Sequence, residues 1–171
     1  QTVLKNNLIS LLDTVFPNAN RLFSSPIRGD GSEKWVDFVA EFWHCRCVSE
    51  KSERTFTNKY QRWCKKHGYN FREAKAHTIY AEASGHIGVM PKSETTKLLV
   101  EQAASQLRAT SAALAALKHE MQSLASMLPE YPVVMDMFGV GPTLGPQLIA
   151  EIGDVRRFYS KKALVAYAGL D

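Results

Sequence analysis

Residues 93–128 read SETTKLLV EQAASQLRAT SAALAALKHE MQSLASML, and this stretch decides the fold class. It contains no glycine or proline, the residues that most often interrupt a helix. Its apolar positions repeat with a period of seven, which is typical of a coiled coil. The seam positions are Val100, Leu107, Leu114, Met121 and Leu128 on one side, with Ala103, Thr110, Leu117 and Leu124 on the other. The pattern predicts a long helix with a coiled-coil seam, here counted as residues 92–129.

A coiled-coil seam needs a second helix, and the sequence leaves two candidates open. One is an amphipathic helix expected over residues 1–16, which would fold back onto the seam. The other is the same helix of a second subunit. Because the N-terminal helix is shorter than the seam, the sequence favours some contribution from a second chain, and we expect a homo-oligomer, a dimer or higher. The N-terminal helix is indicated by apolar residues at helical spacing, namely Leu4, Leu8, Leu11, Leu12 and Val15.

Residues 17–91 are expected to form an aromatic helical insertion. A loop over 17–31 precedes three short helices, the first capped by Ser32, the second beginning near Ser52 and the third starting at Asn70. Gly85, Gly88 and Pro91 are expected to end the third. The apolar stripes of these helices contain Trp35, Phe38, Val39, Phe42, Phe56, Tyr60, Trp63, Cys64, Ala74, Ile79 and Tyr80. Such stripes are more often core than a stacking platform for bases.

The charge of the chain is unevenly distributed. The formal net charge is only +4, but the segment from Glu50 to Lys75 holds eight lysines and arginines against three acids. This segment could lie against phosphates, or it could be a solvated helix surface.

The last region, residues 130–171, holds the strongest functional signal. Phe138-Gly139-Val140-Gly141-Pro142-Thr143-Leu144-Gly145 joins two helical patterns like the turn of a helix-hairpin-helix. Such a turn bares main-chain N–H groups at a helix start, where an anion is favoured. A cationic strip follows, after an expected C-cap at Gly153 and around an expected N-cap at Ser160 for a helix over 161–168. We expect a contact with nucleic-acid backbone that does not read bases; its candidate residues are Gly139, Gly141, Thr143, Gly145, Arg156, Arg157, Lys161 and Lys162.

No residue pattern predicts chemistry within the chain. The histidines and cysteines that invite a zinc interpretation have poor ligand spacing, and buried thiols in a reducing compartment explain them better; they are His44, Cys45, Cys47, Cys64 and His67. Asp136, Glu151 and Asp154 are expected to be solvated acids, not metal ligands. We therefore expect no catalytic residue and no metal site here, and an all-α fold.

The overall composition is that of an ordinary globular protein. With 45% apolar residues and no apolar run near the ~20 residues of a membrane span, we expect a cytoplasmic protein without a membrane partner. Gln1 stands where an initiator methionine is usual, which suggests an excised fragment.

The C-terminal motifs resemble those of one transposase family. They are Met137-Phe138-Gly139-Val140-Gly141, Leu148-Ile149-Ala150-Glu151-Ile152-Gly153-Asp154, Arg157-Phe158, Ser160 and Ala166-Tyr167-Ala168-Gly169-Leu170. This string resembles the C-terminal domain of IS110/IS116/IS902-type insertion-sequence transposases. The opening Leu4-Lys5-Asn6-Asn7-Leu8 also resembles the helix that leaves the catalytic domain of that family, and the heptads resemble its central coiled coil.

The resemblance implies a DNA recombinase that moves an insertion sequence and is guided by an RNA of the element. Such proteins join a RuvC-like domain, whose acids bind a divalent metal such as Mg, to a C-terminal domain with a catalytic serine. Both halves of that active site would lie outside residues 1–171, so this chain alone should be inactive. It would supply dimerisation and backbone binding, with DNA and guide RNA as partners. The alternative is a protein-interaction coiled-coil module with no nucleic-acid contact of its own.

Overall fold

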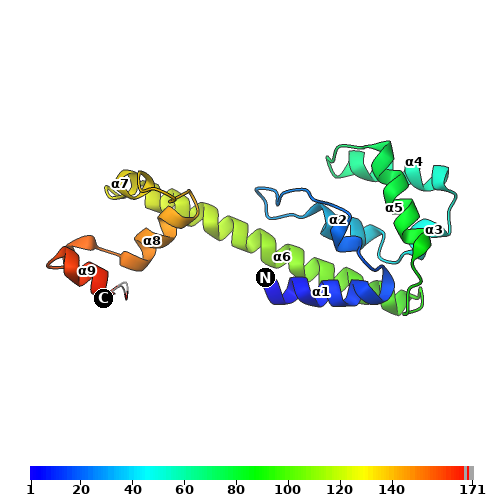
Figure 1. Cartoon of the computed structure of the whole chain (residues 1–171), viewed down its shortest axis with the longest axis horizontal. Coiled ribbons are helices and arrows are strands. Elements are labelled where there is room, and N and C mark those ends of the chain that lie inside the picture. The colour runs from blue at the N-terminus through cyan, green and yellow to red at the C-terminus, as the bar shows by residue number, and fades with distance from the viewer. Residues whose placement is uncertain (168, 170–171) are drawn as a thin grey trace. The chain divides into compact units, whose positions relative to one another are not determined.

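The computed structural model describes residues 1–167 and 169, and it is helical throughout, with no strand in that part of the chain (Figure 1). The all-α prediction is confirmed. The elements are α1 (Thr2–Val15), the 3-10 helix η1 (Ala19–Arg21), α2 (Lys34–Glu41), α3 (Arg46–Ser49), α4 (Glu53–Lys66), α5 (Glu73–Gly85), α6 (Glu94–Ser126), α7 (Tyr131–Met135), α8 (Leu144–Ile152), the 3-10 helix η2 (Val155–Arg157) and α9 (Lys161–Tyr167).

These elements form two compact units, Gln1–Ala115 and Ala116–Asp171, here called the N-terminal and C-terminal units. The boundary falls inside α6. The regions expected separately as 1–16 and 17–91 share one core with the first part of α6.

The core of the N-terminal unit is built on the predicted aromatic stripes. The Phe38 ring stacks on Phe42, with 4.7 Å between centroids, and meets the edge of Trp63 at 5.7 Å. Tyr60 stacks on Trp63 at 5.7 Å and meets Phe38 edge-on at 6.3 Å. All four side chains are buried, so the aromatic residues of α2 and α4 serve as core.

Helix α1 runs antiparallel to the first part of α6 (Figure 1). At one end the Gln1 side-chain amide donates to Ser111 Oγ at 2.8 Å. At the other end the Met90 N–H, just before α6, donates to the Thr14 carbonyl at 3.1 Å. Between these ends both helices contribute buried side chains to one cluster, including Leu8, Leu12, Val100, Ala104 and Leu107. Over this part of the seam, the partner is the fold-back helix of the same chain.

Gly31 allows the loop before α2 to lie directly on α6. Its φ is +81°, a left-handed value that side chains rarely adopt, and a Cβ there would overlap the backbone carbonyl of Ser111. The loop therefore needs glycine for two independent reasons.

Two predicted helix ends, one at Ser52 and one at Gly153, are confirmed. Ser52 caps α4 by accepting a bond from the Thr55 N–H at 3.3 Å. Gly153 follows α8 with φ +66° and donates to the Ile149 carbonyl at 2.8 Å.

Three other predicted ends are wrong. Ser32 does not cap α2: the N-cap position is Glu33, whose carboxylate instead binds Lys5 and Trp35. Helix α5 begins at Glu73, not Asn70. The long helix, expected to reach residue 129, stops at Ser126, because Pro129 disfavours a helical conformation at Leu128.

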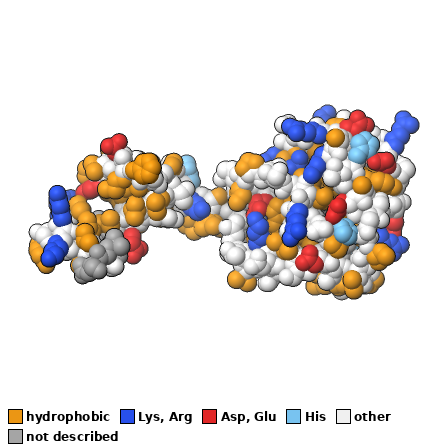
Figure 2. Space-filling model, viewed as in Figure 1, with side chains coloured by type: hydrophobic (Ala, Val, Ile, Leu, Met, Phe, Trp, Pro, Cys, Tyr) orange, Lys and Arg blue, Asp and Glu red, His pale blue; other side chains and the backbone are white. Residues whose placement is uncertain are grey.

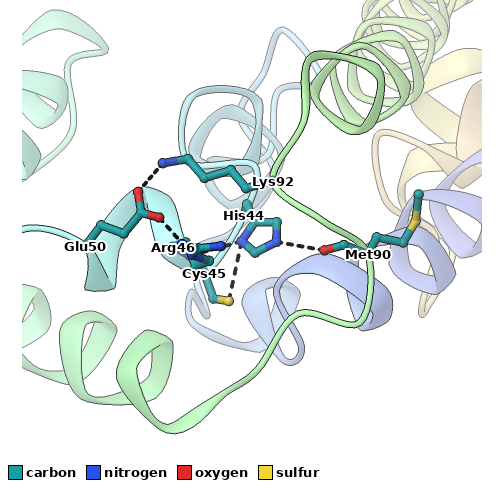
Figure 3. A network of polar contacts seen from close by, with 6 residues as sticks. All are labelled: His44, Cys45, Arg46, Glu50, Met90 and Lys92. Carbon is teal, nitrogen blue, oxygen red and sulfur yellow. Dashed lines mark hydrogen bonds and ion pairs between the residues drawn. The ribbon is translucent and has the colours of Figure 1, made fainter.

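His44 fastens the loop before α6 to the start of α3 (Figure 3). Its Nδ1 accepts from the Arg46 N–H at 3.1 Å, so its Nε2 carries the proton and donates to the Met90 carbonyl at 3.0 Å. The ring is buried, and Gly88 lies against it so closely that a Cβ would come within 2.7 Å of Nε2. Glu50 forms ion pairs with both Arg46 and Lys92, which adds a second link between α3 and the loop before α6. This network holds the loop that leads into α6 against the start of α3.

Candidate nucleic-acid interface

The glycine-rich turn connects α7 to α8 as predicted. Gly139 has a φ of +81° and its neighbour Phe138 is fully exposed. Thr143 occupies the N-cap position of α8, although its side chain makes no capping bond. Gly139, Gly141 and Thr143 therefore lie together on one accessible turn before a helix.

Gly145 differs from the other turn glycines. It is buried, its N–H donates to the Gly141 carbonyl at 2.9 Å, and a Cβ there would lie 2.6 Å from Met135 Sδ. The expectation that Gly145 presents a bare N–H to a phosphate does not fit this bonding. Its role in the structure is to let α7 and α8 pack closely.

The two arginines of η2 are held differently. Asp154 Oδ1 accepts from the Arg156 N–H at 2.9 Å and from Arg156 Nε at 3.2 Å, and these bonds lower the pKa of the Asp154 carboxyl, the backbone bond most. The Arg157 guanidinium stacks over Phe158 at 4.7 Å and Tyr167 at 4.8 Å. Arg157 is thus oriented without a carboxylate partner in the described residues, while Arg156 is partly neutralised.

Lys161 and Lys162 begin α9. Ser160 caps this helix by accepting from the Ala163 N–H at 3.2 Å, as predicted, while the expected last residue, Ala168, lies outside the described residues. Both lysines are exposed, and over residues 1–167 and 169 neither is ion-paired. Their charges are available to an anion.

The coiled-coil positions divide into two groups. Val100 and Leu107 are buried in the core of the N-terminal unit, and Leu114 is half-buried. In the C-terminal unit Leu117 is 63% exposed and Leu124 55% exposed. The rest of the set, Met121 and Leu128, is also exposed.

An apolar groove of about 1060 Å³ lies within the C-terminal unit. The end of α6 and the turn after it supply one wall, with Leu124 and Leu128, and α7 and α8 supply others, with Val133 and Ile149. Figure 2 shows hydrophobic side chains gathered on this unit.

The candidate metal ligands do not converge. In the described part of the chain no three histidine, cysteine or acidic side chains come together as a metal site, and the three cysteines are free thiols. Both ring nitrogens of His44 are occupied by backbone groups. Burial raises the pKa of the Cys47 and Cys64 thiols, which keeps them protonated.

The sequence analysis did not single out Arg28 and Lys34. These cations come from the loop before α2 and from its first residue, and the fold brings them to Arg72 and Lys75 at the start of α5. Only the cation excess over residues 50–75 hinted at part of this cluster.

Comparison with known proteins adds one finding. Residues 131–171, which hold the turn and the cationic strip, match the model of a family described as Transposase IS116/IS110/IS902. No curated protein and no solved structure is detectably similar to the chain. No described helix is long and apolar enough to cross a membrane. The family match supports a transposase-related role. The similarity to this transposase family rests on residues 131–171 of the chain.

Proposed function

We propose that this chain binds nucleic-acid backbone and self-associates as part of a transposase that moves an insertion sequence. The observation that carries the proposal is the exposed cationic strip inside the family-matched segment. It places Arg156, Arg157, Lys161 and Lys162 within seven residues of one another, and the structure pairs only Arg156 with an acid, in the described residues. Phosphates are the anions that a DNA partner presents.

The strip is suited to backbone contact because its lysines are flexible point charges, which bind phosphates without base discrimination. Tyr159, between the arginines and the lysines, is almost fully exposed, as is Phe138 on the turn. Exposed aromatic rings next to cations stack on unpaired bases of any sequence. The proposed ligand is therefore DNA with accessible single-stranded parts, or the guide RNA of the element.

Self-association is proposed through the exposed part of the seam. Leu117, Met121 and Leu124 lie on the last turns of α6, where the chain offers an apolar stripe. A second copy of the same stripe would cover it with coiled-coil packing. Val100 and Leu107, the buried part of the seam, would still pack against α1 of their own chain.

The experiment is a salt titration of binding to labelled duplex DNA, to the same duplex with a single-stranded overhang, and to structured RNA. The variant replaces Lys161 and Lys162 by glutamine, and the control makes the same charge change at Lys97 and Lys118 of α6. If both strip lysines contact phosphates, the slope of log affinity against log salt should fall by about two for the variant and stay unchanged for the control.

Equal slopes for the variant and the wild type would remove the strip from the interface. Sedimentation of the wild type in the same buffers tests self-association. A dimer that binds neither nucleic acid would favour the alternative, a protein-interaction module.

A further inference from the structure

A pocket of about 520 Å³ opens on the N-terminal unit, and none of its lining residues belongs to the family-matched segment. The loop after η1, the first residue of α2, the turn after α4 and the start of α5 enclose it. Its polar lining includes Lys34, Arg72 and Lys75, and its aromatic lining includes Phe23 and Tyr69. No aspartate or glutamate is among its lining residues in the described part of the chain.

Aromatic rings hold the cations in place. Lys34 Nζ lies 4.9 Å from the centroid of Tyr69 and 5.2 Å from that of Phe23, and Lys75 Nζ lies 5.5 Å from Phe23. Arg28 stacks on Tyr69 at 4.0 Å, and its Nη2 donates to the carbonyls of His67 and Gly68 at 3.0 Å each. Because the cations cover these ring faces, the pocket presents charge more than a stacking platform.

Two acids close to Lys34 in sequence, Glu33 and Asp37, are engaged elsewhere. Glu33 binds Lys5 and Trp35, and Asp37 binds Arg108 and the Tyr69 hydroxyl. The charge of the pocket is therefore not compensated by carboxylates of its own walls.

The pKa of Lys34 reflects the crowding of the cations. Burial lowers the pKa of its ammonium group, and the charges of Lys75, Arg28 and Arg72 lower it further. An anion in the pocket would relieve this repulsion.

A second basic pocket on the N-terminal unit differs because an acid is part of its lining. It is lined by cations of α4, among them Lys59 and Lys66, but also by Glu41. Glu41 lies 3.7 Å from Lys59 Nζ and 3.9 Å from Lys66 Nζ. An internal carboxylate already compensates that site.

We propose that the Lys34–Arg72–Lys75 pocket binds backbone phosphate of a single nucleic-acid strand. The three cations of the pocket lining exceed what one phosphate monoanion requires and match the successive charges of a strand. The volume leaves room for the sugar beside the phosphate. The choice of a nucleic acid over a free phosphate rests on the proposed function, whereas the anion site itself rests only on the pocket.

The test measures binding of a labelled oligothymidylate across a salt series. The variant is Lys34→Gln with Lys75→Gln. The control is Arg54→Gln with Lys65→Gln, two exposed cations of α4 that line neither pocket. Two lost phosphate contacts should reduce the salt slope by about 1.4, the value for a single strand, and the control should keep the wild-type slope.

Tryptophan fluorescence verifies the fold of each variant, because all three tryptophans lie buried in the N-terminal unit. Should Lys34→Gln unfold the unit, Arg72→Gln with Lys75→Gln makes the same charge change at the start of α5. A wild-type slope in this folded variant would overturn the proposal.

Two further measurements distinguish a failure of the pocket proposal from a failure of the proposed interface in the C-terminal unit. Sodium pyrophosphate is titrated as competitor: if it binds the wild type and not the variant, while the oligonucleotide binds both equally, a free phosphorylated ligand replaces the nucleic acid. The Lys161/Lys162 variant is measured alongside. If it keeps the wild-type slope while the pocket variant loses slope, the pocket stands and the proposed interface of the C-terminal unit fails.

Discussion

Replacing Leu107 by alanine should destabilise the N-terminal unit strongly, whereas the same change at Leu117 should not. Leu107 is 1% exposed and belongs to the cluster that α1 shares with α6, while Leu117, on the same helix, is 63% exposed. Truncating a buried leucine removes transfer free energy and leaves a cavity, together about 3 kcal/mol. An exposed leucine costs within about 0.5 kcal/mol in the isolated chain.

The assay is urea unfolding followed by tryptophan fluorescence, at two protein concentrations. Trp35, Trp43 and Trp63 all report on the N-terminal unit. Because Leu107 packs within its own chain, its effect should be independent of concentration. Leu117→Ala should leave the transition in place and instead weaken self-association in sedimentation, if the exposed seam joins two copies.

The reasoning would be refuted by a Leu107→Ala cost below about 1 kcal/mol, or by one that grows on dilution. Either result would mean that the first part of α6 packs against a second chain and not against α1.

Three further predictions concern the same unit. Gly31→Ala should lower the free energy of unfolding by about 1–3 kcal/mol, because a side chain there meets the backbone of α6, while Gly29→Ala, with open space around it, should stay near the wild type in the same fluorescence assay. Ser52→Ala should cost about 1 kcal/mol through the lost cap of α4, read as a shift in the urea midpoint at constant m-value. The hydrogen bond to Glu53 raises the pKa of His77 above 6.5, so this bond stabilises the fold at low pH and its contribution is lost as pH rises through the raised value. NMR titration should show that raised pKa, and Glu53→Gln should return it toward 6.5; an unchanged pKa would contradict the bond.

Local chemistry explains which helices the sequence could predict. The stripe of α4 was predicted residue by residue, since Phe56, Tyr60, Trp63 and Cys64 are the buried side chains of that helix and Ser52 caps it. The cap of α9 at Ser160 was predicted for the same reason. These features depend on spacing along one segment, which a sequence displays directly.

Features that depend on competition between segments were missed. Ser32 has the chemistry of a cap, but Glu33 takes the N-cap position and its carboxylate binds Lys5, 28 residues away. The four-residue helix α3 is too short to show periodicity, and it is positioned by the bonds of His44. Gly145 has the spacing of a phosphate-binding glycine, yet close packing on Met135 decides its role.

The sequence by itself determined that this chain is helical and that α6 carries a long apolar seam. It also determined that the last region resembles a transposase segment with a cationic strip. These features could be predicted because periodicity, helix-breaking residues and motifs are local properties of a sequence. Only the tertiary structure decided which part of the seam is covered. The fold-back of α1 buries Val100 and Leu107 and leaves Leu117 and Leu124 exposed, although all four share one pattern. It also gathered Lys34, Arg72 and Lys75 around one pocket, with the charge of Arg28 acting on Lys34. Burial and the summation of charge depend on which distant segments meet, and pairing between segments is set by the whole core, not by any one of them.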